Sequence, residues 1–80
     1  MAGLLIVAAT GPNDATRASI PFHIAVNGAV PAGTEVAIAL AGDAAELARP
    51  DVVDAVVGVG IPRLRELVDK CVAHAVRVYV

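Results

Sequence analysis

Hydrophobic residues are concentrated in three runs along the chain, and each run has the length of a β-strand. The runs are Leu4–Ala9, Glu35–Ala41 and Arg77–Val80, and in the first two the apolar side chains do not alternate with polar ones. A short apolar run of this kind is typical of a strand that is buried on both faces of a parallel sheet. The pattern therefore predicts three strands.

Apolar residues at helical spacing fill two of the segments between these runs. In the first segment, either Asp14 or Thr16 is placed to cap a helix, because its side-chain oxygen can accept a hydrogen bond from a free backbone N–H. Gly33 is expected to end this helix. The clearest helix runs from Pro62 to Ala75, where the apolar residues form one stripe. Two ion pairs are expected on its solvent side, Arg65 with Asp69 and Glu66 with Lys70.

Two short helical segments are predicted between the second strand and that helix. Asp43 is placed to cap the first, Ala44–Ala48, and Pro50 is expected to stop it. The second covers Asp51–Val57 and ends at the Gly58-Val59-Gly60 turn. The order of elements is thus strand, helix, strand, two short helices, helix, strand.

This order predicts one α/β domain over residues 1–80, with no internal repeat and no linker. Right-handed crossovers between parallel strands lead us to expect a three-layer α/β/α sandwich with the strand order 2-1-3. In open sheets of this class, ligands bind beyond the carboxyl ends of the strands. The residues expected to line that rim are Thr10, Gly11, Asn13, Asp14, Gly42 and Asp43.

Backbone amides that begin the helices after this rim would favour an anionic ligand. Turn formation and helix capping explain the same residues equally well, so both interpretations stay open.

The composition adds an expectation of self-association. Hydrophobic residues make up 58% of the chain and aromatic residues 2%, with a mean hydropathy of +0.74. Seventeen Ala and fourteen Val supply most of the apolar content, which is more than one small domain can hide. We therefore expect a homo-oligomer.

The charges and the single cysteine exclude several classes of protein. A net charge of −2 with six scattered Lys and Arg residues argues against binding to nucleic acid or to an anionic membrane surface. No uncharged stretch is long and continuous enough to span a bilayer. One cysteine rules out an intramolecular disulfide framework, and the expected compartment is the reducing cytoplasm.

Conventional catalytic and cofactor motifs are weak in this sequence. The Gly58-Val59-Gly60 segment lacks the third glycine of a dinucleotide fingerprint, and Thr10-Gly11-Pro12 lacks the GK[ST] ending of a phosphate-binding loop. The catalytic residues therefore stay unassigned, and neither a cofactor nor a metal site is predicted.

The remaining reactive side chains have ordinary explanations. Cys71 lies in the middle of the apolar stripe, so its thiol is predicted to be buried and protonated. His23 and His74 are interpreted as boundary or solvated residues, and Asp43 with Glu46 as part of a helix cap.

Several short segments, taken in order, resemble one family. They are Leu4–Ala9 with Thr10-Gly11-Pro12-Asn13-Asp14, Thr16-Arg17-Ala18, Pro21-Phe22, Val36–Leu40 with Gly42-Asp43-Ala44-Ala45-Glu46-Leu47, and the Pro62-to-Ala75 helix leading into Val78-Tyr79-Val80. In this order they resemble the DsrE/DsrF-like proteins, small α/β proteins of sulfur relay and sulfur oxidation, some of them described as peroxiredoxin-like. The resemblance covers essentially the whole chain and rests on order rather than on one motif.

The resemblance implies a chemistry that needs a further residue. In active members a cysteine directly after the third strand accepts sulfane sulfur as a persulfide and passes it to a partner protein. Aligned on Val78-Tyr79-Val80, that cysteine would lie at or just past the end of this sequence, and Cys71 does not match it. The family has two further strands, so the sequence resembles the amino-terminal two-thirds of such a protein.

Three explanations are open for the missing part: a truncated gene product, a member that has lost its chemistry, or a reading frame ended at a selenocysteine codon. Two classes of function follow. The first is a DsrE-like sulfur-relay or thiol-redox carrier with a sulfur-carrier protein as its partner. The second is a non-catalytic module that binds a small ligand or another chain. The edge of the third strand and the excess apolar surface favour pairing with another chain in closed symmetry, so a dimer or trimer, or a hexamer built from these, is expected in either case. The resemblance implies the same, since members of that family commonly form trimers and hexamers.

Overall fold

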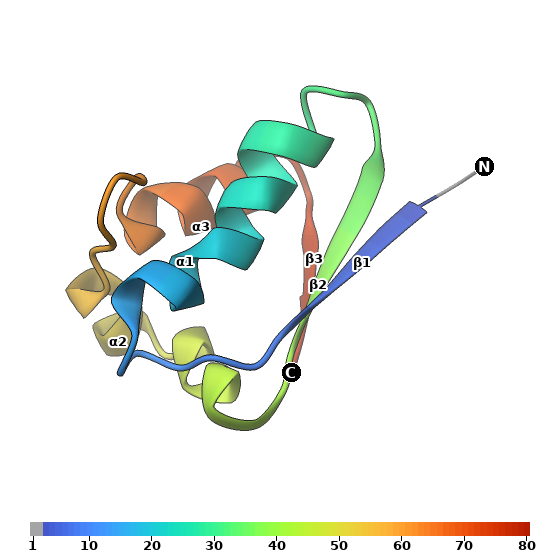
Figure 1. The fold of residues 1–80 in the computed structure, drawn as a ribbon. Helices are drawn as coiled ribbons and strands as arrows, with labels where there is room; N and C mark the ends of the chain where they lie inside the picture. The colour runs from blue at the N-terminus through green and yellow to red at the C-terminus, as the bar shows by residue number, and fades with distance from the viewer. Residues whose placement is uncertain (1–2) are drawn as a thin grey trace.

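The computed structural model describes residues 3–80 as a three-stranded parallel sheet with its helices on one face (Figure 1). The elements in chain order are β1 (Gly3–Ala8), α1 (Ala15–Ile24), the π-helical turn η1 (Ala25–Ala29), β2 (Glu35–Leu40), the 3₁₀ helix η2 (Gly42–Ala48), α2 (Pro50–Ala55), α3 (Leu64–Ala73) and β3 (Arg77–Tyr79). The predicted mixed α/β class is thereby confirmed.

The strand order is 1-2-3, so the predicted order 2-1-3 is wrong. β2 lies in the centre, paired in parallel with β1 from Gly3↔Glu35 to Ala8↔Leu40 and with β3 from Ala37↔Arg77 to Ala39↔Tyr79. Both orders satisfy right-handed crossovers. In the observed order both crossovers step the same way across the sheet, which places their helices on the same face.

On this shared face the helices pack on one another as well as on the sheet. Phe22 of α1 and Leu64 and Leu67 of α3 are buried together with Ile38 of β2 in a single core. Small residues let the backbones approach closely. Those in the core are Ala8, Ala18, Ala25 and Ala44.

The strands are buried on one face only, which corrects the expectation that both faces are covered. Side chains alternate across a strand, and on β1 Leu5 and Val7 are 60% and 64% exposed, whereas Ala8 is buried. Ile38 and Leu40 of β2 point to the helix side and are buried. Among residues 3–80 the fold therefore has two layers, and the third predicted layer is not among them.

The helix boundaries follow the capping residues only in part. Asp14 caps α1, because its Oδ1 accepts a hydrogen bond from the backbone N–H of Arg17 at 3.1 Å. Of the two predicted caps, Asp14 and Thr16, the structure therefore has Asp14. Asp43 does not cap a helix, because η2 already begins at Gly42 and Asp43 lies in its first turn. Pro50 opens α2 instead of only ending the preceding segment, since a proline ring suits the first position of a helix.

The helix with the clearest apolar stripe is shorter at both ends than the sequence predicted. α3 begins two residues after Pro62 and ends at Ala73, and Ala75 then adopts a positive φ of 55° before β3. Within residues 3–80, none of the helices has both the length and the apolar character that crossing a membrane requires.

Candidate functional site

The loops that follow β1 and β2 meet at the carboxyl end of the sheet. A Cβ on Gly11 would lie 2.6 Å from the carbonyl oxygen of Asp43, so the two loops are in direct backbone contact. The N–H of Ala41 also donates to the carbonyl oxygen of Ala8 at 2.8 Å. Only glycine allows this approach at position 11.

The other residues of the predicted rim lie around this contact. Thr10 is half-buried, and Asn13, Gly42 and Asp43 are exposed. Asp14 is engaged in capping α1 and lies 3.8 Å from Arg17 Nε. The hollows described below are lined by other residues, so ligand binding by this rim stays a prediction.

Cys71 is buried in the core, as predicted. Burial raises the pKa of the Cys71 thiol, because the apolar surroundings disfavour the thiolate. A sulfur nucleophile reacts as the thiolate and needs access to its substrate. Cys71 therefore lacks both properties of a working thiol.

The two histidines lie on α1 and at the end of α3, and neither is buried. His74 is exposed at the C-terminal end of α3. His23 Nδ1 lies 3.0 Å from Asn27 Nδ2, so this nitrogen acts as the acceptor. Asn27 Oδ1 accepts from Lys70 Nζ at 3.0 Å, and Lys70 thereby joins α3 to η1. The predicted pairing of Lys70 with Glu66 is replaced by this contact.

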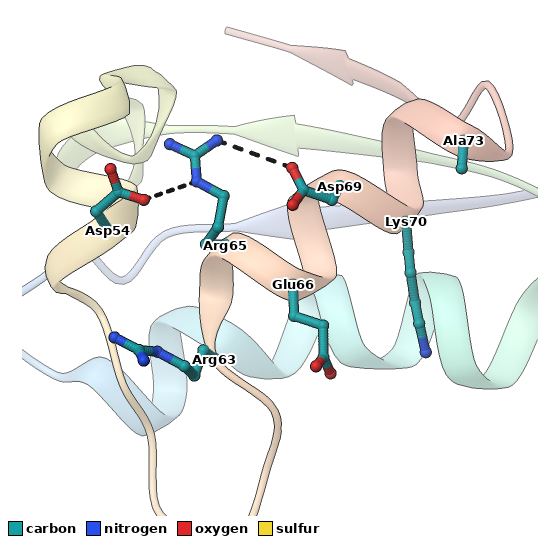
Figure 2. A pocket seen from close by; sticks show the side chains of 7 residues that line it. All are labelled: Asp54, Arg63, Arg65, Glu66, Asp69, Lys70 and Ala73. Carbon is teal, nitrogen blue, oxygen red and sulfur yellow. Dashed lines mark hydrogen bonds and ion pairs between the residues drawn. The ribbon is translucent and has the colours of Figure 1, made fainter.

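A charged hollow of about 640 Å³ lies along the outer side of α3 (Figure 2). Arg65 lies between two carboxylates, with its Nε 2.7 Å from Asp54 Oδ1 and its Nη1 3.9 Å from Asp69 Oδ1. Its Nη2 donates to the carbonyl oxygen of Pro50 at 3.3 Å. The hydrogen bond from Arg65 lowers the pKa of the Asp54 carboxyl, and the same bond raises the pKa of Arg65.

This hollow has no preference for one sign of charge. Its walls carry three acidic and three basic side chains: Asp54, Glu66, Asp69, Arg63, Arg65 and Lys70. The guanidinium of Arg65 is already bound by the protein, so it is not free to hold an anion. The helix spacing predicted the Arg65–Asp69 pair, whereas the shorter Arg65–Asp54 contact depends on how α2 packs beside α3.

No group of three or more metal-ligating side chains comes together within residues 3–80. Cys71 and His74, three apart on α3, differ in exposure and form no joint site.

The edge of β3 combines an unpaired strand with an apolar hollow. β3 pairs with β2, and within residues 3–80 no strand pairs with its other edge. A hollow of about 300 Å³ adjoins it on the helix side. Its apolar lining includes Leu40, Val53, Val68, Val78 and Val80.

Sequence reasoning missed the uncovered face of the sheet, although a signal was available. Arg77-Val78-Tyr79-Val80 alternates polar and apolar side chains, which is typical of a strand with one face in water. In β2 the alternation is one of size, because the small residues Ala37 and Ala39 alternate with larger apolar ones.

The comparisons with known proteins return no relative. No family model matches the chain, and neither a curated protein nor a solved structure is significantly similar to it.

Proposed function

We propose that this chain is a non-catalytic interaction module that self-associates through the edge of β3. The observation that carries the proposal is the edge of β3, which no other strand of residues 3–80 pairs with and which lies directly beside an apolar hollow. Exposed backbone donors and acceptors on an edge strand favour pairing with another chain. The adjoining apolar surface would add hydrophobic burial to those hydrogen bonds.

A two-fold antiparallel pairing fits the residues of β3. If two copies pair with Val78 opposite Val78, Arg77 of each copy lies opposite Tyr79 of the other. No like charges then face each other across the strands, and a guanidinium beside an aromatic ring is favourable. Such an arrangement is closed and gives a dimer.

The apolar side chains beside the edge would become covered in this dimer. Val80 is 78% exposed next to the hollow. On α3, Val68 lines the hollow and Val72, one turn later, is 77% exposed. Residues four apart lie on the same helix face, so Val72 extends the apolar surface.

The state of the only cysteine supports a non-catalytic role. Persulfide transfer needs an accessible thiolate, whereas Cys71 is buried with a raised pKa. The sulfur-relay function remains a prediction that requires a reactive sulfur or selenium atom other than Cys71.

Sedimentation velocity at micromolar concentration tests the proposal. We expect the unmodified chain to sediment as a dimer and the Val80→Asp and Val72→Asp variants as monomers, because a charge would be buried without a partner. Val59→Asp is the matched control, since Val59 is 84% exposed in a loop away from β3. A monomeric unmodified chain, or equal dimerisation of all three variants, would contradict the proposal. Circular dichroism confirms that each variant is folded.

A further inference from the structure

The apolar hollow beside β3 lies at the carboxyl end of the sheet. Leu40 is the last residue of β2, Val80 follows β3, and both line the hollow. The other walls come from η2, α2 and α3, which connect these two strands along the chain (Figure 1). In parallel α/β sheets, ligands bind beyond the carboxyl ends of the strands. The hollow is therefore at the end of the sheet where a ligand site is expected.

The hollow reaches down to the core of the protein. Phe22, Leu47 and Val53 are buried core residues, and all three line it. They belong to α1, η2 and α2, so the floor is built from three separate elements. The hollow is thus a recess between elements, and a molecule inside it is contacted from several sides.

The lining of the hollow is apolar, with one charged side chain. Nine of its ten lining side chains are apolar, and the tenth is Arg65. The Arg65 guanidinium already binds Asp54 Oδ1 at 2.7 Å and the carbonyl oxygen of Pro50 at 3.3 Å. Water in such a recess finds few hydrogen-bond partners, and replacing poorly ordered water by an apolar group favours binding. The lining therefore favours an uncharged, apolar ligand.

The volume of the hollow limits the size of that ligand. It measures about 300 Å³, which is at the lower end of the range for ligand pockets. An apolar cavity of about 150 Å³ is already large enough to hold benzene. The hollow therefore fits a single ring or a short branched hydrocarbon chain.

We propose that this hollow is a binding site for one small, uncharged, apolar molecule. The ligand contacts Leu47 and Val53 on the floor, and Leu40 and Val68 beside them. The dissociation constant is on the order of 1 mM, because a ligand of this size has few atoms and makes no charged contact.

This site does not depend on the proposed dimer, because its floor belongs to one copy of the chain. Strand pairing extends the sheet in its own plane, whereas the hollow lies on the helix side of β3. Val72 contributes to the dimer surface but does not line the hollow. The Val72→Asp variant therefore separates ligand binding from self-association.

Toluene is the probe, and its binding is measured by the amide and methyl chemical shifts of the labelled protein. We expect saturable shifts at Leu40, Leu47 and Val53, with nuclear Overhauser effects between the toluene ring and the methyl groups of these residues. Benzoate and benzylammonium carry the same ring with a charge of either sign. Both are expected to bind at least about tenfold more weakly than toluene, because their charge would be buried without a partner.

Two leucine substitutions decide whether the hollow is the binding site. Ala48 lines the hollow and is exposed, so Ala48→Leu fills it without crowding the core. This variant is expected to bind toluene at least about tenfold more weakly, because the added side chain takes the space of the ligand. Ala55→Leu is the matched control, since Ala55 is exposed and does not line the hollow. It is expected to bind toluene like the unmodified chain, and circular dichroism checks that both variants are folded.

The outcomes for the ligand site and for the dimer are distinguishable. The absence of saturable toluene shifts, equally tight binding of benzoate, or equal effects of Ala48→Leu and Ala55→Leu would contradict the ligand site. Toluene binding by Val72→Asp but not by the unmodified chain would show that a second copy fills the hollow, which also contradicts it. Toluene binding by a chain that sediments as a monomer would support the ligand site and contradict only the dimer.

Discussion

Single residues decide how closely the segments of this small protein approach one another. Gly11 allows the loop after β1 to touch the backbone at Asp43, and alanines at buried positions let the helices lie near the sheet. With few large side chains in the chain, the packing depends on such close approaches more than on bulky anchors. Substitutions that add one methyl group therefore have very different effects at different positions.

Gly11→Ala is expected to destabilise the protein by about 1–3 kcal/mol, because the added Cβ overlaps a backbone oxygen that has little freedom to move. Gly28→Ala is the matched control. A Cβ at Gly28 meets nothing within 4 Å, and alanine there is expected to stabilise by about 0.5–1 kcal/mol. The midpoints of urea denaturation of the two variants measure this difference in stability. Equal midpoints would show that the loops do not meet as described.

Cys71 is expected to make stability depend on pH in the alkaline range. Burial raises the pKa of its thiol above the ordinary value of 9.0, so the folded state holds the proton more tightly than the unfolded state. The stabilisation is full below pH 9.0 and is lost as the pH rises through the raised pKa of the folded state.

Urea denaturation of the unmodified chain and of Cys71→Ala across this pH range isolates the effect of the thiol, since all other groups titrate in both. We expect a steeper fall for the unmodified chain. Parallel curves, or rapid alkylation of Cys71 in the folded protein, would mean that the thiol is accessible.

At the scale of single elements, caps and ion pairs position the helices around the core. Asp14 begins α1, while Arg65 ties α3 to Asp54 at the end of α2. The cap follows from local sequence, because acceptor and donor are three residues apart. The Arg65–Asp54 contact joins residues eleven apart and exists only once α2 and α3 have packed.

Asp14→Ala is expected to cost about 1 kcal/mol, because the backbone N–H of Arg17 loses its acceptor. Asp14→Asn keeps a capping oxygen but removes the charge, and it is expected to stay near the stability of the unmodified chain. Thermal denaturation of both variants separates the cap from the exposed ion pair with Arg17. If Asp14→Asn is as unstable as Asp14→Ala, the charge rather than the cap is responsible.

At the scale of the whole molecule, the sheet is covered on one face, and the two faces should respond differently to mutation. Ile38→Val on the helix side is expected to cost about 0.5–1.5 kcal/mol, since Ile38 is fully buried. Val7→Thr on the open face is expected to change stability by less than about 0.5 kcal/mol. Urea denaturation of dilute protein measures both. A large cost for Val7→Thr would mean that the open face is covered.

The sequence by itself determined the local features of this protein. Apolar runs located β1, β2 and β3, helical spacing located α1 and α3, and the position of Cys71 in an apolar stripe predicted its burial. These features depend on neighbours within a few residues, so their signals are contained in short stretches of chain. The rim residues were likewise located at the ends of strands, although their role stays a prediction.

Only the tertiary structure decided how the elements are arranged. Right-handed crossovers allow the third strand to lie on either side of the first two, and the packing of α1 against α3 selects the order 1-2-3. That order leaves Leu5 and Val7 exposed, although they belong to a continuous apolar run that predicts burial on both faces of the sheet. Apolar side chains occur both on buried faces and on exposed ones, so hydrophobicity alone does not distinguish the two faces of a strand.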